Sequence, residues 1–228
     1  MIKKLLQPLA LGVILLLAAC AESSYETHQT YFFPQYPGGM NFYADQESDT
    51  IHLISLDSWT ARSATSWLKV SPESETIPTG YIGDTRLTIT AEKNTTGENR
   101  TGWIEVKSYS NLGMVINQSH WLNISLPRPI YNMATDFSTK KATFKMNLFP
   151  HTSDTTIVFK VYQNDATLSS NAEWLVPQTD KFEKGEHKVS LNITPNSDNT
   201  ERNATLTLTS GGISTPISIV QLAKSNEE

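Results

Sequence analysis

The chain contains one stretch of sequence twice, and this internal repeat limits what it can fold into. Leu87–Asn94 matches Val189–Asn196 at an offset of 102 residues. The same offset joins three further pairs: Arg100 with Arg202, Ile104 with Leu206, and Val106 with Leu208. Gln118 and Gln221 close the two copies at an offset one residue longer. Because surface loops tolerate changes of length, a nearly constant offset with small slips indicates two tandem domains. We expect them to meet near Ser125–Pro129.

Each copy has the alternation of half-buried β-strands. Leu87, Ile89 and Ala91 are apolar and are separated by polar residues, which is the period-two pattern of a strand with one buried face. Residues 94–100 and 196–202 are rich in turn formers and each lies between two such segments. Short strands separated by turns predict an all-β chain with two tandem immunoglobulin-like antiparallel β-sandwiches.

The chain has one cysteine, so no disulfide can form within it. Trp67 and Trp174 each precede a leucine at matching places in the two copies. We therefore expect these two tryptophans to supply the central packing of their sandwiches. For the paired arginines and glutamines we expect a structural role, in which they bond turn carbonyls or a neighbouring carboxylate.

The N-terminus has the three parts of an export signal. Two lysines make it positive, Leu9–Ala19 is apolar, and small residues precede Cys20. The apolar run is about half of the ~20 residues that a transmembrane helix needs. Leu17-Ala18-Ala19-Cys20 resembles a bacterial lipobox, which implies cleavage after residue 19 and a lipid on Cys20 that anchors the chain firmly. The alternative is an ordinary signal peptide followed by an incidental cysteine.

These features predict the organisation of the chain and its location. Residues 1–19 are the signal peptide, 20–37 the lipidated cysteine and tether, 38–125 the first domain and 126–225 a diverged second domain. We expect a lipid anchor in the outer membrane, on its periplasmic or cell-surface face. Removing the signal lowers the net charge from −5 to −7. An acidic chain without a basic stripe is not expected to bind nucleic acid.

Several short motifs carry a resemblance to a known family. They are Trp59-Thr60, Trp67–Pro72, Leu87–Thr90, Asn94–Gly102 and Ile116–Gln118. Together they look like a BACON domain (Bacteroidetes-associated carbohydrate-binding often N-terminal) over residues 38–124. A diverged copy covers 130–224, although it lacks the Thr-Gly that follows Arg100 in the first copy. The resemblance implies an immunoglobulin-like sandwich on an extracytoplasmic protein, often attached to glycan-degrading enzymes. It implies carbohydrate binding or, equally well, a spacer role.

Trp103 is the first candidate for ligand binding. By alternation with Ile104 it points to solvent, and its counterpart in the second copy is only Thr205. An exposed indole suits stacking on a sugar ring or docking of a protein. Glu105 lies on the same face and can accept bonds from sugar hydroxyls. Further candidates are Trp121 near the domain junction and, more weakly, Tyr109. The structural alternative is that Trp103 packs on a loop or on the other domain.

No motif supports catalysis, a cofactor or a metal. The five histidines are scattered, and neither a His-Glu-x-x-His pattern nor a nucleophile elbow occurs. Asp45, Glu47 and Asp49 resemble part of a calcium loop without its glycine and distal glutamate, so a solvated turn is expected there.

We therefore expect a non-enzymatic lipoprotein that captures a polysaccharide or oligosaccharide at the cell surface. The alternative is a structural spacer or interaction subunit that positions an outer-membrane partner protein.

Overall fold

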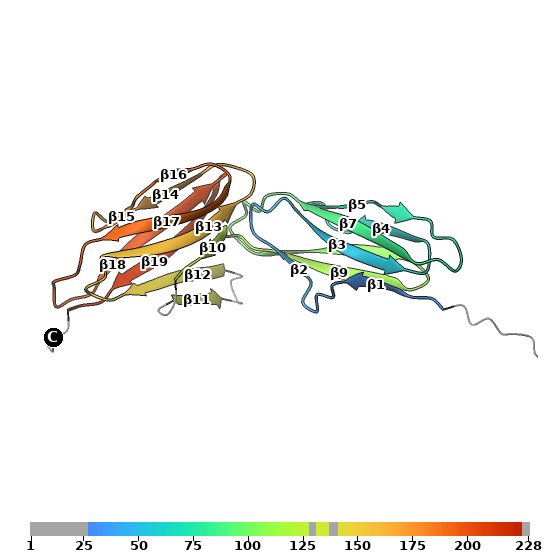
Figure 1. Cartoon of the computed structure of the whole chain (residues 1–228), viewed down its shortest axis with the longest axis horizontal. Helices are drawn as coiled ribbons and strands as arrows, with labels where there is room; N and C mark the ends of the chain where they lie inside the picture. Colours follow the sequence, from blue (N-terminus) through green and yellow to red (C-terminus); the bar gives the residue numbers. More distant parts are fainter. Residues whose placement is uncertain (1–26, 128–130, 137–140, 225–228) are drawn as a thin grey trace, which may run out of the picture.

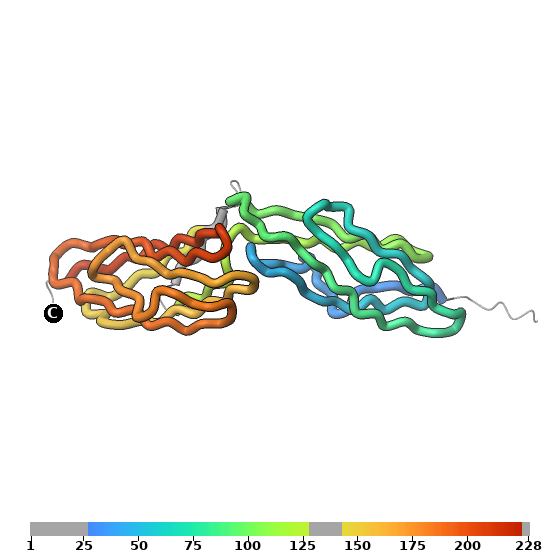
Figure 2. Tube along the Cα trace, turned by 90° about the horizontal axis from the view of Figure 1, so that it is seen from above, coloured from blue at the N-terminus to red at the C-terminus, as the bar shows by residue number. Residues whose placement is uncertain are grey.

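The structure, a computed structural model, describes residues 27–127, 131–136 and 141–224. Two β-sandwiches lie end to end in an elongated molecule, with the first described residue at one end and the last described residue at the other (Figures 1 and 2). The described residues form strands and turns and include no helix that could cross a membrane. The predicted all-β fold is confirmed.

The first sandwich consists of two sheets that pack face to face. The four-stranded sheet has the order β1 (Thr30–Phe33), β3 (Ser48–Ser55), β7 (Gly83–Ala91) and β5 (Leu68–Ser71). The five-stranded sheet has the order β2 (Met40–Phe42), β9 (Asn111–Gln118), β8 (Arg100–Lys107), β4 (Trp59–Ser63) and β6 (Ser74–Glu75). All pairs are antiparallel except β2 with β9, which is parallel.

The second sandwich repeats this topology. One sheet has the order β10 (Asn123–Ser125), β13 (Asp154–Val161), β17 (Gly185–Ile193) and β15 (Leu175–Pro177). The other has the order β11 (Tyr131–Asp136), β12 (Lys141–Leu148), β19 (Ile213–Gln221), β18 (Arg202–Ser210), β14 (Ala166–Ser170) and β16 (Lys181–Phe182). Among the strands of the described residues, only β11 has no counterpart in the first domain. The pairing of β12 with β19 is parallel, as is that of β2 with β9. The repeat in sequence is thus a repeat in strand order.

Both ends of the first sandwich differ from the expected boundaries. Thr30–Phe33, expected within the tether, pairs as β1 with β3. Asn123–Ser125, expected in the first domain, pairs as β10 with β13 of the second. Leu122 is fully buried in the core of the second sandwich, so the chain passes between the domains just after Gln118.

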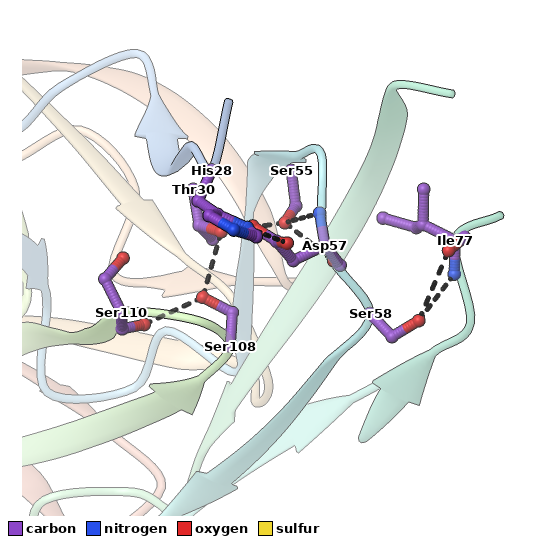
Figure 3. Close-up of polar contacts among 8 residues, drawn as sticks. All are labelled: His28, Thr30, Ser55, Asp57, Ser58, Ile77, Ser108 and Ser110. Carbon is purple, nitrogen blue, oxygen red and sulfur yellow. Dashed lines mark hydrogen bonds and ion pairs between the residues drawn. The ribbon is translucent and has the colours of Figure 1, made fainter. Parts of the chain in front are cut away.

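The chain enters the first domain through polar contacts at its outer end (Figure 3). The Thr30 hydroxyl lies 2.8 Å from the Ser55 hydroxyl and accepts a bond from the Ser108 hydroxyl at 2.9 Å. His28 Nδ1 lies 2.7 Å from a carboxylate oxygen of Asp57. These bonds attach residues 28–30 directly to the sandwich.

The cores follow the predicted alternation, with one correction among the tryptophans. Leu87, Ile89 and Ala91 are buried, as are the inward residues of the facing sheet. The buried tryptophan of the first domain is Trp59, which is 2% exposed. Trp67 and its counterpart Trp174 are only half-buried and pack against the edges of their cores. The prediction that they lie at the centre of the cores is wrong, because one face of each ring is covered by an arginine.

Candidate functional site

Arg100 and Gln118 form a structural clamp over Trp67. The Arg100 guanidinium lies 4.2 Å from the centre of the Trp67 ring, a cation–π distance. Arg100 Nε donates to Gln118 Oε1 at 2.8 Å, and Gln118 Nε2 donates to the Glu92 carbonyl at 3.0 Å. Burial lowers the pKa of Arg100, and the nearby Glu92 carboxylate partly opposes this. The clamp ties the start of β8 to the end of β9.

The second domain has the same clamp. Arg202 lies 4.5 Å from the centre of the Trp174 ring, and its Nε donates to Gln221 Oε1 at 2.9 Å. In both domains a buried asparagine, Asn94 or Asn196, donates to one carbonyl in its own turn (Glu98 or Thr200) and to one carbonyl directly after the closing strand (Ser119 or Leu222). The repeated motif residues therefore bond to the protein itself, which accords with the structural role expected of the arginines and glutamines.

Trp103 lies on the outer face of the five-stranded sheet, on β8. Its side chain is 41% exposed. A Cβ atom added at Gly113 on the neighbouring strand would lie 1.9 Å from Trp103 Cζ2, so the indole occupies the space above this glycine. Among the described residues, no acceptor bonds the indole N–H. The indole therefore packs directly on Gly113, and the exposed part of the residue faces solvent.

A charged pair lies beside this ring. Glu105 is the cross-strand partner of Gly113. One carboxylate oxygen of Glu105 lies 2.7 Å from Nε of Arg62 on β4 and 2.6 Å from its terminal nitrogen. The pair is partly exposed, so its worth to stability is small. The pair itself adds no net charge beside Trp103, and it offers both donors and acceptors to a ligand.

A polar row that the sequence reasoning missed crosses the same face one position toward the second domain. The Thr101 hydroxyl donates to Asn117 Oδ1 at 3.3 Å, and Asn117 Nδ2 donates to Asn41 Oδ1 at 3.2 Å. Thr101 and Asn41 are exposed. The alternation that turns Trp103 outward also turns out Thr101, but the pairing of β2 with β9 is needed to add Asn41.

The other two aromatic candidates lie at opposite ends of the first domain. Trp121 is half-buried at the domain junction, where its ring meets Phe144 edge-on at 6.0 Å. Tyr109 lies in the turn after β8 at the outer end, where its ring stacks on His28 at 3.5 Å. The structure therefore brings Trp103 and Glu105 together, places Trp121 beyond the polar row, and leaves Tyr109 apart from them.

Asp45 lies buried at the junction instead of in the solvated turn expected from its sequence, which is a correction. Its residue is 1% exposed, and Oδ2 accepts the backbone N–H of Tyr162 in the second domain at 2.8 Å. The buried Oδ1 has no partner. Burial raises the pKa of this carboxyl, against the lowering effect of the Tyr162 N–H and of Lys93. Over the described ranges, no group of three or more histidine, cysteine or acidic side chains could hold a metal ion.

Comparisons with known proteins agree with the repeat. The model of the BACON family, described as "Putative binding domain, N-terminal", matches residues 57–119 and 163–222. No curated protein matches the sequence.

Solved structures resemble the chain only at low identity. The Bacteroides ovatus GH5 xyloglucanase in complex with a XXXG heptasaccharide is 19% identical over 42% of this chain, with a TM-score of 0.33. The match spans 19% of the xyloglucanase chain. A Bacteroides thetaiotaomicron protein solved by NMR is 17% identical over 45% of this chain and 93% of its own, with a TM-score of 0.28. The Escherichia coli chaperone DraB is 9% identical over 86% of this chain and 97% of its own, with a TM-score of 0.32.

Proposed function

The chain belongs to the BACON family, whose model matches more than half of it, and from that premise we propose that it is a non-catalytic accessory protein that binds glycans. The observation that carries this proposal is the exposed indole of Trp103 on the open sheet face. A sugar ring has an apolar face that can lie on an aromatic ring, and its hydroxyls need polar partners around that ring. The Arg62–Glu105 pair supplies such partners beside Trp103.

The proposal places the protein at a membrane surface. The lipobox-like stretch ending at Cys20 supports a lipid anchor, although Cys20 and the signal peptide lie outside the described residues. An anchor there would hold the chain at the outer membrane, on the periplasmic or cell-surface face. The first described residues lie at the end of the molecule opposite the last described residues, so the sandwiches would extend outward from the anchor (Figure 1).

The second candidate is a spacer that positions an outer-membrane partner. It is favoured by the two clamps, in which the residues that the domains share are all used to hold the fold. The end-to-end arrangement of the sandwiches also supports it (Figure 2). The two candidates differ in one property: only the first needs Trp103 to touch a ligand.

Calorimetric titration of residues 21–228 with neutral and acidic polysaccharides tests the proposal. Trp103→Ala should abolish binding, while Tyr109→Ala, which removes a more exposed aromatic ring at the outer end of the domain, should bind as the wild type does. Thermal melting of both variants checks that the fold is intact. No binding across the panel, or equal binding by Trp103→Ala, refutes the proposal and favours the spacer.

A further inference from the structure

A cleft of about 650 Å³ lies at the junction, and both domains line it. The first domain contributes the polar row of Asn41, Thr101 and Asn117, and the second contributes Ile124 and Phe144. Trp121, which connects the domains, forms part of the wall. A cleft of this size lies within the range of small-molecule sites, which are apolar surfaces with a few convergent polar groups. Neither domain could form it alone.

The cleft continues the sheet face that carries Trp103. Residues 101 and 103 are successive outward positions on β8, so their Cα atoms lie roughly 7 Å apart. The Trp103 indole leans further along the strand, over Gly113. The path from the indole to the cleft therefore spans at least two outward positions of the strand, or roughly 14 Å. A single sugar ring cannot touch both ends of this surface.

The polar groups along this path are amides and hydroxyls. The cleft lining contains asparagine, threonine, serine and glutamine and, within the described chain, no carboxylate. Its one cation, Arg100, is already bonded to Gln118 and the Glu92 carbonyl. At the other end Arg62 and Glu105 neutralise each other. Amides can both donate to and accept from hydroxyl groups, so the surface matches a ligand rich in hydroxyls and without net charge.

Bonds between the domains and bonds of the segment that connects them hold the cleft in shape. The Ala44 N–H donates to the Trp121 carbonyl at 3.0 Å. The Leu122 N–H donates to the Thr215 hydroxyl at 2.9 Å, and both residues are buried. Together with the bond from Tyr162 to Asp45, these contacts preform the site, so a ligand need not spend binding energy on ordering the domains.

We propose that the junction cleft is a second subsite, and that the ligand is a neutral oligosaccharide segment that stacks on Trp103 and reaches across the polar row into the cleft beside Trp121. This inference rests on the proposed function, since it takes Trp103 as the first subsite. It adds two properties: affinity must grow with chain length until both ends are filled, and both domains must take part.

The test is a length series of neutral oligosaccharides, from disaccharide to octasaccharide, of the cello-, manno-, xylo- and laminari- types. Oligogalacturonides serve as the acidic control. Affinities are measured for the wild type, Trp103→Ala, and the double variant Asn41→Ala with Thr101→Val. NMR shifts of the Asn41 and Asn117 side-chain amides in the wild type report contact without any substitution.

We expect affinity for one neutral series to rise with length and the double variant to lose about tenfold for the long members only, as two lost hydrogen bonds would give. Trp103→Ala should lose binding at every length. Binding that needs Trp103 but is independent of length, with unshifted asparagine amides, overturns the second subsite and leaves the proposed function standing. Preference for the acidic series overturns the assigned ligand class. If no oligosaccharide of any series binds the wild type, both proposals are overturned.

Discussion

Replacing Gln118 by Met should destabilise the first domain by about 2.5 to 6 kcal/mol. Methionine fills nearly the same volume but cannot accept the bond from Arg100 Nε, a charge-assisted hydrogen bond worth about 1.5 to 3 kcal/mol. The Glu92 and Ala44 carbonyls, 3.0 and 3.3 Å from Gln118 Nε2, lose their donor. Each neutral bond is worth about 0.5 to 1.5 kcal/mol. A domain of this size loses about 4 to 8 °C per kcal/mol, so the sum lowers the melting temperature by roughly 10 to 50 °C.

The repeat supplies a matched variant for this experiment. Gln221→Met breaks the same clamp in the second domain, where Gln221 bonds Arg202 and the Pro150 carbonyl. Scanning calorimetry gives the loss of stability, and hydrogen exchange of β9 and β19 shows which domain carries it. A loss below about 1 kcal/mol for Gln118→Met would show that solvent replaces the clamp bonds, and the structural role of the motif would be refuted.

Two further predictions concern the sheet face and the junction. Gly113→Ala should push the Trp103 indole off the sheet and weaken glycan binding. It should cost less than about 2 kcal/mol of stability, because alanine suits a strand better than glycine. Fluorine NMR of labelled tryptophan detects the displacement of the indole, and an unchanged Trp103 resonance contradicts the prediction. Asp45→Asn should stabilise the protein at neutral pH, because the amide still accepts the Tyr162 N–H without a buried charge. Because the pKa of Asp45 is raised in the folded state, the wild type loses stability as the pH rises from the ordinary value of 3.8 through the folded pKa. The melting temperatures of the wild type and Asp45→Asn should therefore converge below this pH window and separate above it. Curves that stay parallel at every pH would contradict the assignment.

Local patterns were enough to predict the strands, because alternation depends only on which face is buried. The same patterns did not predict which tryptophan lies at the centre of the core. Trp67 precedes β5 at the edge of the sandwich, whereas Trp59 begins β4 and points inward. A tryptophan fits either position, and the arginine that covers Trp67 comes from a strand more than thirty residues away. Burial at an edge therefore could not be read from neighbouring residues.

The candidate site likewise combines features that follow from local patterns with features that depend on contacts between distant residues. The outward direction of Trp103 and Glu105 follows from alternation along one strand. Their joining to Asn41 depends on the pairing of β2 with β9, which are separated by most of the domain. The sequence around Asp45 predicts a solvated turn, whereas the turn is buried at the junction, where Asp45 accepts a bond from Tyr162 of the other domain. Contacts across domains leave no periodic signal.

The parallel pairing of β2 with β9, and of β12 with β19, sets an order of folding. In each domain the last strand of the sandwich, β9 or β19, pairs with an early strand, β2 or β12. The sheet that contains this pair can be completed only after nearly the whole domain has been synthesised. Such long-range pairing slows folding, because the loop entropy is lost before the contacts form. The first domain ends at Gln118 and can complete its sheets while β12 to β19 are still being made. Each ribosome would then release a molecule whose first half is already closed, which limits pairing between the edges of two similar domains.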